Sequence, residues 1–381
     1  MIDSYTSSSN ESWFTRIKNA IVGVLIGIII FIASFPVLFL NEGRAVKTAQ
    51  SLAEGAKSVV SISSDKVDSG NEKKLVHLTG LAETKETLTD PVFNVSEEKA
   101  IKLIRRVEMY QWKETKKSKS KKQTGGGTKT ETTYSYNKVW SDDVINSNNF
   151  NKSQQYRNPS KKPYSGEVEA AKEVTLGGFT LSASLIDKII TESPVRVSAD
   201  TLPAELKNNL TVSNNKYYLG DNPSSPQIGD TRISFEVVKP EKVSIISRQI
   251  GNTFEPYKTK AGDTIERLEI GEVSADTMFK NALEENNLWT WIVRAIGFLL
   301  MLVGLNLIFG PIAVLADVIP FIGNLVGGGI FLSSLFVSLI LSSLTISIAW
   351  IFYRPLIGIL LLVIGGGIGF GIMMLIKKKK S

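Results

Sequence analysis

The chain has 381 residues, with 44 Lys/Arg and 37 Asp/Glu, which gives a formal net charge of +7. Residues 41–287 hold 36 of the basic and 34 of the acidic side chains, so most of the basic excess lies beside the apolar ends of the chain. A nucleic-acid-binding protein needs a basic face on a folded domain, whereas basic residues that flank apolar runs are typical of membrane proteins. The charge distribution therefore argues against nucleic acid and favours membrane lipid as a partner.

Cysteine is absent, and His77 is the only histidine. These counts exclude disulfides, thiolate catalysis, Cys-ligated metals and a multi-His metal site. No Gly-rich phosphate loop occurs, and no serine motif accompanies His77, so a structural or surface histidine is favoured over a catalytic one. We expect no catalytic residues, no metal and no cofactor, and hence a protein that is not an enzyme.

The first apolar run covers residues 20–40 and contains no charge. At about 1.5 Å per residue it spans roughly 31 Å, which matches the hydrocarbon core of a bilayer. A signal peptide would have a shorter apolar core and small residues at a cleavage site, but this run ends in bulky residues. The pattern favours an uncleaved transmembrane helix that follows a tail of residues 1–19.

A second apolar run covers 288–309 and begins with Trp289 and Trp291, which fit an interfacial aromatic belt. Arg294 lies close enough to the end of the run to extend towards the interface. Asn306 lies deeper, and its amide needs a partner, for which we expect another helix. Gly310-Pro311 interrupts the run, and we interpret 310–327 as an interfacial or re-entrant connection.

Two further apolar segments follow this connection. Residues 318–353 carry no charge, and we place a third transmembrane helix at 328–351. Proline is tolerated in the first turn of a helix, so Pro355 is expected to open a fourth transmembrane helix at 355–376. The four lysines at 377–380 belong to a basic tail, 377–381, and place the C-terminus on the cytosolic side. Four spans then put the N-terminal tail in the cytosol and residues 41–287 on the opposite face.

Glycines in the apolar runs recur at helical spacing, which allows helix backbones to approach closely. The interpretation as specific helix association competes with the ordinary abundance of glycine in membrane helices. The candidates for helix packing are the following residues: Gly23, Gly27, Asn306, Gly323, Gly327, Gly365 and Gly369.

The polar middle, residues 41–287, is long enough for one large domain or two small ones. Alternating apolar residues predict strands at 75–80, 106–112, 231–238 and 243–250. Helical spacing predicts helices at 45–60, 181–190 and 274–287. This mixture indicates an α+β domain with antiparallel strands. The sequence class is therefore a multi-pass α-helical membrane protein with four transmembrane helices and a large α+β domain between the first and the second.

Residues 116–133 form a low-complexity segment that is rich in lysine, between two strand-like stretches. A hairpin with a long solvated tip is the simplest interpretation, because blocks of like charge are usually disordered. The alternative is a surface that contacts anionic lipid headgroups or an acidic partner. Three asparagine sequons, at Asn94, Asn151 and Asn209, matter only in a glycosylating compartment.

Several segments, taken together and in order, resemble the transmembrane protein 43 (LUMA) family. Each is weak alone, but nine occur in order between about residues 38 and 357. The resemblance is carried by the stretches 41–49 with 51–55, 107–114, 134–140, 145–150, 185–188, 229–235, 260–264, 304–307 and 352–356. Within them, the motif residues that we single out are Asn41, Glu42, Gly43, Arg44, Glu108, Tyr110, Trp112, Arg354 and Pro355.

The resemblance implies four spans with both termini in the cytosol or nucleoplasm and a large luminal domain. It also implies residence in the endoplasmic reticulum and the nuclear inner membrane. The implied function is organisation of the nuclear envelope through self-association and through emerin- or lamin-like partners, without catalytic residues to carry over. The final Lys378-Lys379-Lys380-Ser381 is similar to a dilysine retrieval signal, and a stop-transfer cluster explains it equally well.

The sequence thus favours a non-enzymatic integral membrane scaffold that forms a homo-oligomer and binds other membrane proteins. In a eukaryote it would reside in the endoplasmic reticulum and the nuclear inner membrane, and in a bacterium in the cell inner membrane. Two alternatives stay open for the domain at 41–287: an activity on lipid, and modulation of ion conductance. The near absence of ionisable groups deep in the apolar runs makes a dedicated ion pathway the weaker of these.

Overall fold

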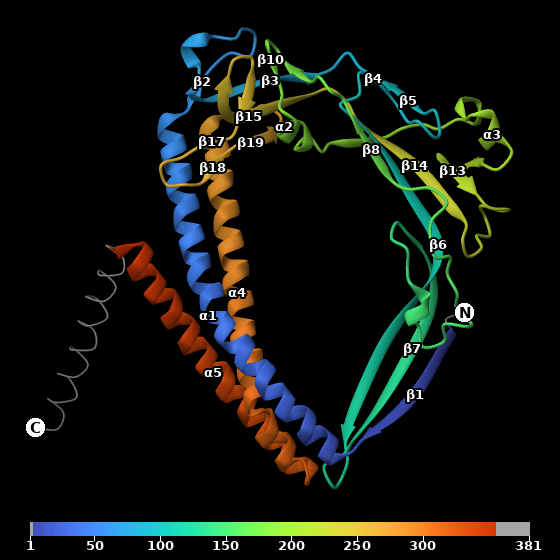
Figure 1. Cartoon of the computed structure of the whole chain (residues 1–381), viewed down its shortest axis with the longest axis vertical. Helices are drawn as coiled ribbons and strands as arrows, with labels where there is room; N and C mark the ends of the chain where they lie inside the picture. The colour runs from blue at the N-terminus through green and yellow to red at the C-terminus, as the bar shows by residue number, and fades with distance from the viewer. Residues whose placement is uncertain (1–2, 356–381) are drawn as a thin grey trace, which may run out of the picture.

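The computed structural model describes residues 3–355, and three long helices form one side of the molecule (Figure 1). They are α1 (Trp13–Ser58), α4 (Ala275–Ala316) and α5 (Pro320–Tyr353). Each contacts the other two along its length. Bulky apolar side chains such as Leu25, Ile29 and Phe336 are exposed on their outer faces, as expected for surfaces that contact lipid. The helices therefore form a small apolar bundle.

The expected layout of four transmembrane helices is corrected by this structure. Within residues 3–355, three helices are long and apolar enough to cross a membrane. The fourth helix was expected at 355–376, and this range lies outside the described residues except for Pro355. The chain is therefore described as a membrane protein with three apolar helices of spanning length in its described part.

The expected ends of the helices were also wrong. Gly310-Pro311 does not end a helix, and α4 continues through both residues to Ala316. The connection to α5 comprises only residues 317–319, whereas we expected 310–327. A proline inside a helix costs about 3 kcal/mol, but irregular backbone exposed to lipid leaves several polar groups without hydrogen bonds. Continuing the helix through Pro311 is therefore the smaller cost in an apolar environment.

Two of the helices extend well beyond their apolar parts. The predicted helices at 45–60 and 274–287 are the ends of α1 and α4, not separate elements. The predicted helix at 181–190 is reduced to α2 (Ala183–Asp187), and α3 (Ala204–Lys207) is equally short. The domain between α1 and α4 is thus β-rich, and the expected α+β class is corrected accordingly.

The strands of this domain form two large sheets that are almost entirely antiparallel. The predicted strands are confirmed as parts of β3, β6, β14 and β15. The first sheet has the order β1-β7-β6-β14-β13-β12, with β11 on β14 and β8 on β6. Its strands are β1 (Asp3–Glu11), β6 (Lys102–Lys122), β7 (Thr128–Ser141), β8 (Glu167–Ala170), β11 (Glu192–Pro194), β12 (Thr211–Ser213), β13 (Lys216–Leu219) and β14 (Thr231–Val238).

The second sheet has the order β10-β9-β3-β15-β16, with β19 on β15 and β2 parallel to β3. Two small hairpins, β4–β5 and β17–β18, complete the domain. The remaining strands are β2 (Val60–Ser61), β3 (Leu75–Glu83), β4 (Thr87–Thr89), β5 (Ser96–Glu98), β9 (Thr175–Leu176), β10 (Phe179–Thr180), β15 (Glu241–Ile250), β16 (Thr253–Glu255), β17 (Tyr257–Lys258), β18 (Thr264–Ile265) and β19 (Arg267–Ile270).

Three clusters of buried side chains form the core of the domain. One surrounds Phe179 and Ile245 in the second sheet, and one surrounds Phe93 and Tyr217 in the first. The third joins Leu52 of α1 and Met278 of α4 to strands of the second sheet. Because α1 and α4 run without a break from the apolar bundle into this third core, the bundle and the domain are joined rigidly.

The hairpin of β6 and β7 extends far from the domain towards the Trp13 end of α1 (Figure 1). The N-terminal strand β1, in the segment expected to be a separate tail, pairs with β7 and widens the hairpin to three strands. We call residues 3–11, 115–122 and 128–135 the polar ribbon. Hydroxyl pairs such as Ser118–Thr132 (3.0 Å) and Ser120–Thr130 (2.8 Å) cross it. The lysine-rich segment is therefore largely paired strand and not a long loop.

Candidate functional site

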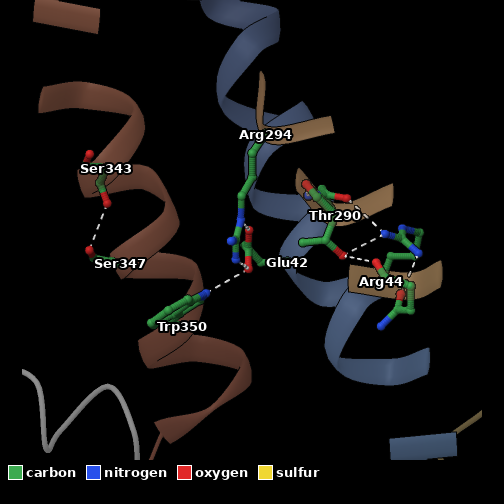
Figure 2. A network of polar contacts seen from close by, with 9 residues as sticks. Glu42, Arg44, Thr290, Arg294, Ser343, Ser347 and Trp350 are labelled. Atoms are coloured by element: carbon green, nitrogen blue, oxygen red, sulfur yellow. Dashed lines mark hydrogen bonds and ion pairs between the residues drawn. The ribbon is translucent and has the colours of Figure 1, made fainter. Parts of the chain in front are cut away.

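A polar junction connects the three long helices at the end of the first apolar run (Figure 2). The Glu42 carboxylate of α1 accepts two hydrogen bonds from Arg294 of α4, at 2.6 and 2.8 Å. The indole Nε1 of Trp350 in α5 donates to the same carboxylate at 2.8 Å. The Glu42 side chain is 2% exposed and that of Arg294 is 15% exposed. One carboxylate therefore links all three helices.

Aromatic rings surround the arginine of this junction. The Arg294 guanidinium lies 4.7 Å from the ring centroid of Trp291 and 5.7 Å from that of Trp350. A cation gains about 0.5–2 kcal/mol from such contacts, with the larger values where water is excluded. A buried ion pair needs good geometry and additional hydrogen bonds to offset the cost of desolvation, and the bidentate pair with its indole donor provides both.

Gly43 permits the close approach of α5 to α1 beside the junction. A Cβ atom at this position would lie 2.5 Å from Cζ of Tyr353, far closer than packed carbon atoms allow. The Tyr353 ring also packs against Phe39, with 5.2 Å between their centroids. The four motif residues 41–44 thus act together, because the glycine brings α5 close enough for Trp350 to reach Glu42.

A second set of contacts on the same motif links α1 to α4. Arg44 donates to Asn286 at 2.9 Å and to Thr290 at 3.1 Å, and Asn41 donates to the Thr290 carbonyl at 3.1 Å. The Asn286 amide donates to the Ala45 carbonyl at 3.0 Å. All these partners of Arg44 are neutral. The charge of Arg44 is therefore not matched by an ion pair among residues 3–355.

The glycine candidates occupy different environments. Gly27 lies against α4, where a Cβ would be 2.8 Å from the Gly304 carbonyl oxygen, and Gly23 faces Leu307 at 3.7 Å. Gly323 packs on Asp317, whereas a Cβ on Gly327 would meet open space. Gly365 and Gly369 lie outside the described residues. Gly23 and Gly27 are thus placed at a contact within one chain, and Gly327 is placed on a free surface.

Asn306 does not contact a second helix through its amide donor. Its Nδ2 donates to the Leu302 carbonyl, one turn earlier in α4, at 2.8 Å. A helix satisfies its own polar side chains in this way where no partner is near. Among residues 3–355, the structure therefore shows no second helix that accepts from this donor.

The motif residues of the domain lie in β6 and hold the first sheet together. Glu108 accepts two hydrogen bonds from Arg232, at 2.6 and 2.7 Å, and one from Lys216 at 3.1 Å. The bonds from Arg232, and then from Lys216, hold the pKa of Glu108 below its usual 4.5 against the opposing effect of burial. This carboxylate therefore remains ionised and joins three adjacent strands.

The two aromatic motif residues pack on the flanks of the same strand. Tyr110 lies against Trp140, and Trp112 lies against Tyr156, with 5.0 and 4.9 Å between ring centroids. The backbone of Trp112 is bridged by the Asn158 amide, at 2.7 and 2.9 Å. The last two motif residues lie at the end of α5. The backbone N–H of Arg354 donates to the Trp350 carbonyl at 2.7 Å and so ends the helix. Arg354 is half-buried, and Pro355 is exposed.

His77 lies in β3 of the second sheet, and both of its ring nitrogens have hydrogen-bond partners. Its Nε2 lies 2.8 Å from the Val273 carbonyl oxygen, and its Nδ1 lies 3.3 Å from the Ser61 hydroxyl. In the described part of the chain no group of three His, Asp or Glu side chains could hold a metal ion.

Asp317 forms a second buried ionic cluster, which the sequence did not reveal as a site. Its carboxylate, 1% exposed, pairs with Arg16 of α1 and with Lys122 of the ribbon, the latter at 2.6 Å. The Trp13 indole donates to the Val314 carbonyl nearby at 2.9 Å. The sequence did contain a signal for the pairing of Glu42. This carboxylate lies at the end of the uncharged run 20–40, and the next apolar run contains Arg294.

Comparison with known proteins gives a consistent result. The sequence model of the family "Transmembrane protein 43" matches residues 109–355. The chain is 37% identical to human "Transmembrane protein 43" over 366 residues, which cover 93% of this chain and 90% of the human protein. It is 30% identical to the "Transmembrane protein 43 homolog" of Drosophila melanogaster over 355 residues, which cover 90% and 91% of the two chains. No solved structure matches.

Proposed function

Because the chain belongs to the transmembrane protein 43 family, we propose that it is a non-enzymatic membrane scaffold that acts through self-association and partner binding. The observation that carries this proposal is the continuity of α1 and α4 from the apolar bundle into the core of the β-rich domain. A scaffold must hold its binding surfaces at a fixed position relative to the membrane, and two unbroken helices achieve this.

The polar junction supports the same proposal. Glu42, Arg294 and Trp350 fix the relative rotation of the three helices, because each contact requires one helix face to point inwards. An enzyme would instead need an acid, base or nucleophile directed into a cavity. In the polar junction, the charged groups of Glu42 and Arg294 bind each other.

For compartment and partners, the proposal follows the family resemblance. We propose the endoplasmic reticulum and the nuclear inner membrane as the location, with emerin- or lamin-like proteins as partners. Purification of the full chain from mild detergent, followed by identification of bound proteins, tests this. Membrane and nuclear-envelope proteins among those retained would support the scaffold, whereas retention of only soluble metabolic enzymes would contradict it.

Self-association is expected to use the free glycine surface of α5. A Cβ on Gly327, Gly328 or Gly329 would meet nothing within 4 Å, so this surface is available to a second copy. Gly327→Leu should reduce the crosslinked dimer in membranes several-fold. Gly310→Leu is the matched control, since Gly310 in α4 is equally open but stands alone. Equal dimer yields in both variants and in the parent chain would remove this surface from the proposal.

A further inference from the structure

A small pocket lies where α1 and α4 leave the apolar bundle and meet β18 and β19. Its volume is about 190 Å3. The residues that give it its chemistry are Arg44 of α1, Arg267 of β19, and Glu285 and Trp289 of α4. It lies on the domain side of the polar junction, because Asn286 and Thr290, which hold Arg44, form the adjoining turns of α4.

Both arginines of this pocket have unused capacity to bind an anion. Arg44 is exposed, and within residues 3–355 it donates only to the neutral side chains of Asn41, Asn286 and Thr290. Arg267 pairs with Glu285 through Nη2 at 2.8 Å, but its buried Nε has no hydrogen-bond partner in the same part of the chain. A buried guanidinium donor without an acceptor is unfavourable, so an acceptor supplied from outside would stabilise it.

The two glutamates that line the pocket are already paired, and Asp263 outside it accepts a hydrogen bond from the Thr48 hydroxyl at 2.8 Å. Glu285 is matched by Arg267 itself. Glu266, which also lines the pocket, is occupied by Lys188 at 2.7 Å and by the Ser184 hydroxyl at 2.9 Å. Arg44 therefore has no ionic partner among the side chains that line the pocket, and a guanidinium in this state suits a phosphate.

The position of the pocket relates it to the membrane surface. Trp289 lines it and is 53% exposed, and the neighbouring Leu288 and Trp291 are 61% and 67% exposed. Exposed tryptophans at the end of an apolar helix occupy the headgroup region of a bilayer. At this depth in a bilayer, lipid phosphates are the anions at hand. The acyl chains of such a lipid would lie along the exposed apolar surface of α4.

We propose that this pocket binds the phosphate of a membrane phospholipid, with Arg44 and Arg267 as its cationic ligands. Arg44, one of the four motif residues that begin at Asn41, then has a role in lipid binding in addition to its contacts with α4. The Nε of Arg267 supplies the donor that the protein leaves free. The bound lipid would fix the depth of the domain against the bilayer.

The experiment is native mass spectrometry of the full chain in detergent, with phosphatidylglycerol added. Arg44→Gln/Arg267→Gln should reduce the fraction of chain that carries lipid at least about tenfold, because both cationic donors to the phosphate are removed. Arg106→Gln, which removes an arginine from an exposed ion pair far from the bundle, is the matched control and should bind lipid as the parent chain does. Arg267→Gln alone keeps the Arg44 contacts with α4 intact and should show a several-fold loss, so the test survives misfolding of the double variant.

Two further arms identify the source of the phosphate. Diacylglycerol, which has acyl chains but no phosphate, should not bind at this pocket, and inorganic phosphate alone should not replace phosphatidylglycerol. Equal lipid occupancy in the parent chain and the double variant would overturn the proposal, as would an equal loss in Arg106→Gln. Saturation of the pocket by inorganic phosphate without displacement by lipid would overturn the assignment to a phospholipid.

Discussion

At the scale of single residues, Glu42 is the side chain on which the helix bundle depends most. It is nearly inaccessible to solvent and has one cationic partner, Arg294, so loss of its charge leaves a guanidinium uncompensated in an apolar environment. Removing one partner of a buried pair typically costs 3–5 kcal/mol. We expect Glu42→Gln to lower the free energy of unfolding of the detergent-solubilised chain by about 3 kcal/mol, measured by denaturant titration.

Two variants make this test specific. Ser347→Ala removes an exposed hydroxyl of α5 that is bonded only to the Ser343 carbonyl, and it should leave stability nearly unchanged (Figure 2). Glu42→Gln/Arg294→Gln should cost less than the sum of the two single changes, because the second change removes the charge that the first left unpaired. Strict additivity would show that the two side chains do not act as a pair.

Glu108 gives the domain a defined dependence on pH. Its pKa in the folded state is lowered by Arg232 and Lys216, so its ion pairs stabilise the fold above about pH 4.5 and are lost as the pH falls through the lower folded-state value. Glu108→Gln should cost about 1 kcal/mol at pH 7 and nothing once the carboxylate of the parent chain is protonated. Thermal unfolding between pH 3 and 7 measures this. Glu272→Gln should change stability very little at any pH, because solvent screens the fully exposed pair of Glu272 with Lys242.

At the scale of elements, the α1–α4 contact is set by glycine. A Cβ at position 27 would approach both the Gly304 carbonyl oxygen and Leu307 Cβ to 2.8 Å, so backbone stands in its way and cannot yield. Overpacking a closely packed contact typically costs about 1–3 kcal/mol and occasionally more. Gly27→Leu should therefore lower the free energy of unfolding of the bundle by more than about 2 kcal/mol. Gly327→Leu, on the open surface, should unfold like the parent chain. Similar losses in both would mean that the close backbone approach at Gly27 does not govern the stability of the bundle.

The elements also show how far sequence patterns reach. Period-two alternation found β14 and the central part of β6, since each has one buried and one exposed face. The polar ribbon offered no such alternation, because Ser, Thr and Lys occupy both faces. Residues 116–133 were therefore interpreted as the long solvated tip of a hairpin, and residues 1–19 as a tail. Pro311 was interpreted as a helix end, although the surrounding apolar segment favours unbroken helix. The partnership of Glu42 with Arg294 and Trp350 could not be found from the sequence, because it depends on how three distant helices rotate against one another.

At the scale of the whole molecule, the polar ribbon and the apolar bundle impose conflicting requirements. The ribbon leaves the domain and reaches the opposite end of the helices, where Lys122 meets Asp317 and the Gly125 amide donates to the Val318 carbonyl at 3.1 Å (Figure 1). A ribbon that carries several lysines cannot lie in hydrocarbon, where unpaired polar edges and charges are costly. The tip can therefore contact Asp317 only where no continuous bilayer surrounds the bundle.

This conflict leads to a prediction about the state of the chain in detergent and in membranes. The sequence contains no cysteine, so Lys122→Cys/Asp317→Cys introduces the only two thiols. A short bismaleimide should join them in the detergent-solubilised chain and should fail to do so in sealed vesicles, because the bilayer separates the tip from the α4–α5 connection. Ser118→Cys/Thr132→Cys, within the ribbon, should crosslink in both settings. Equal crosslinking of the first pair in vesicles would place the ribbon tip, the N-terminal strand and this connection on one aqueous face, and residues 41–287 would then not be confined to the face opposite the N-terminus.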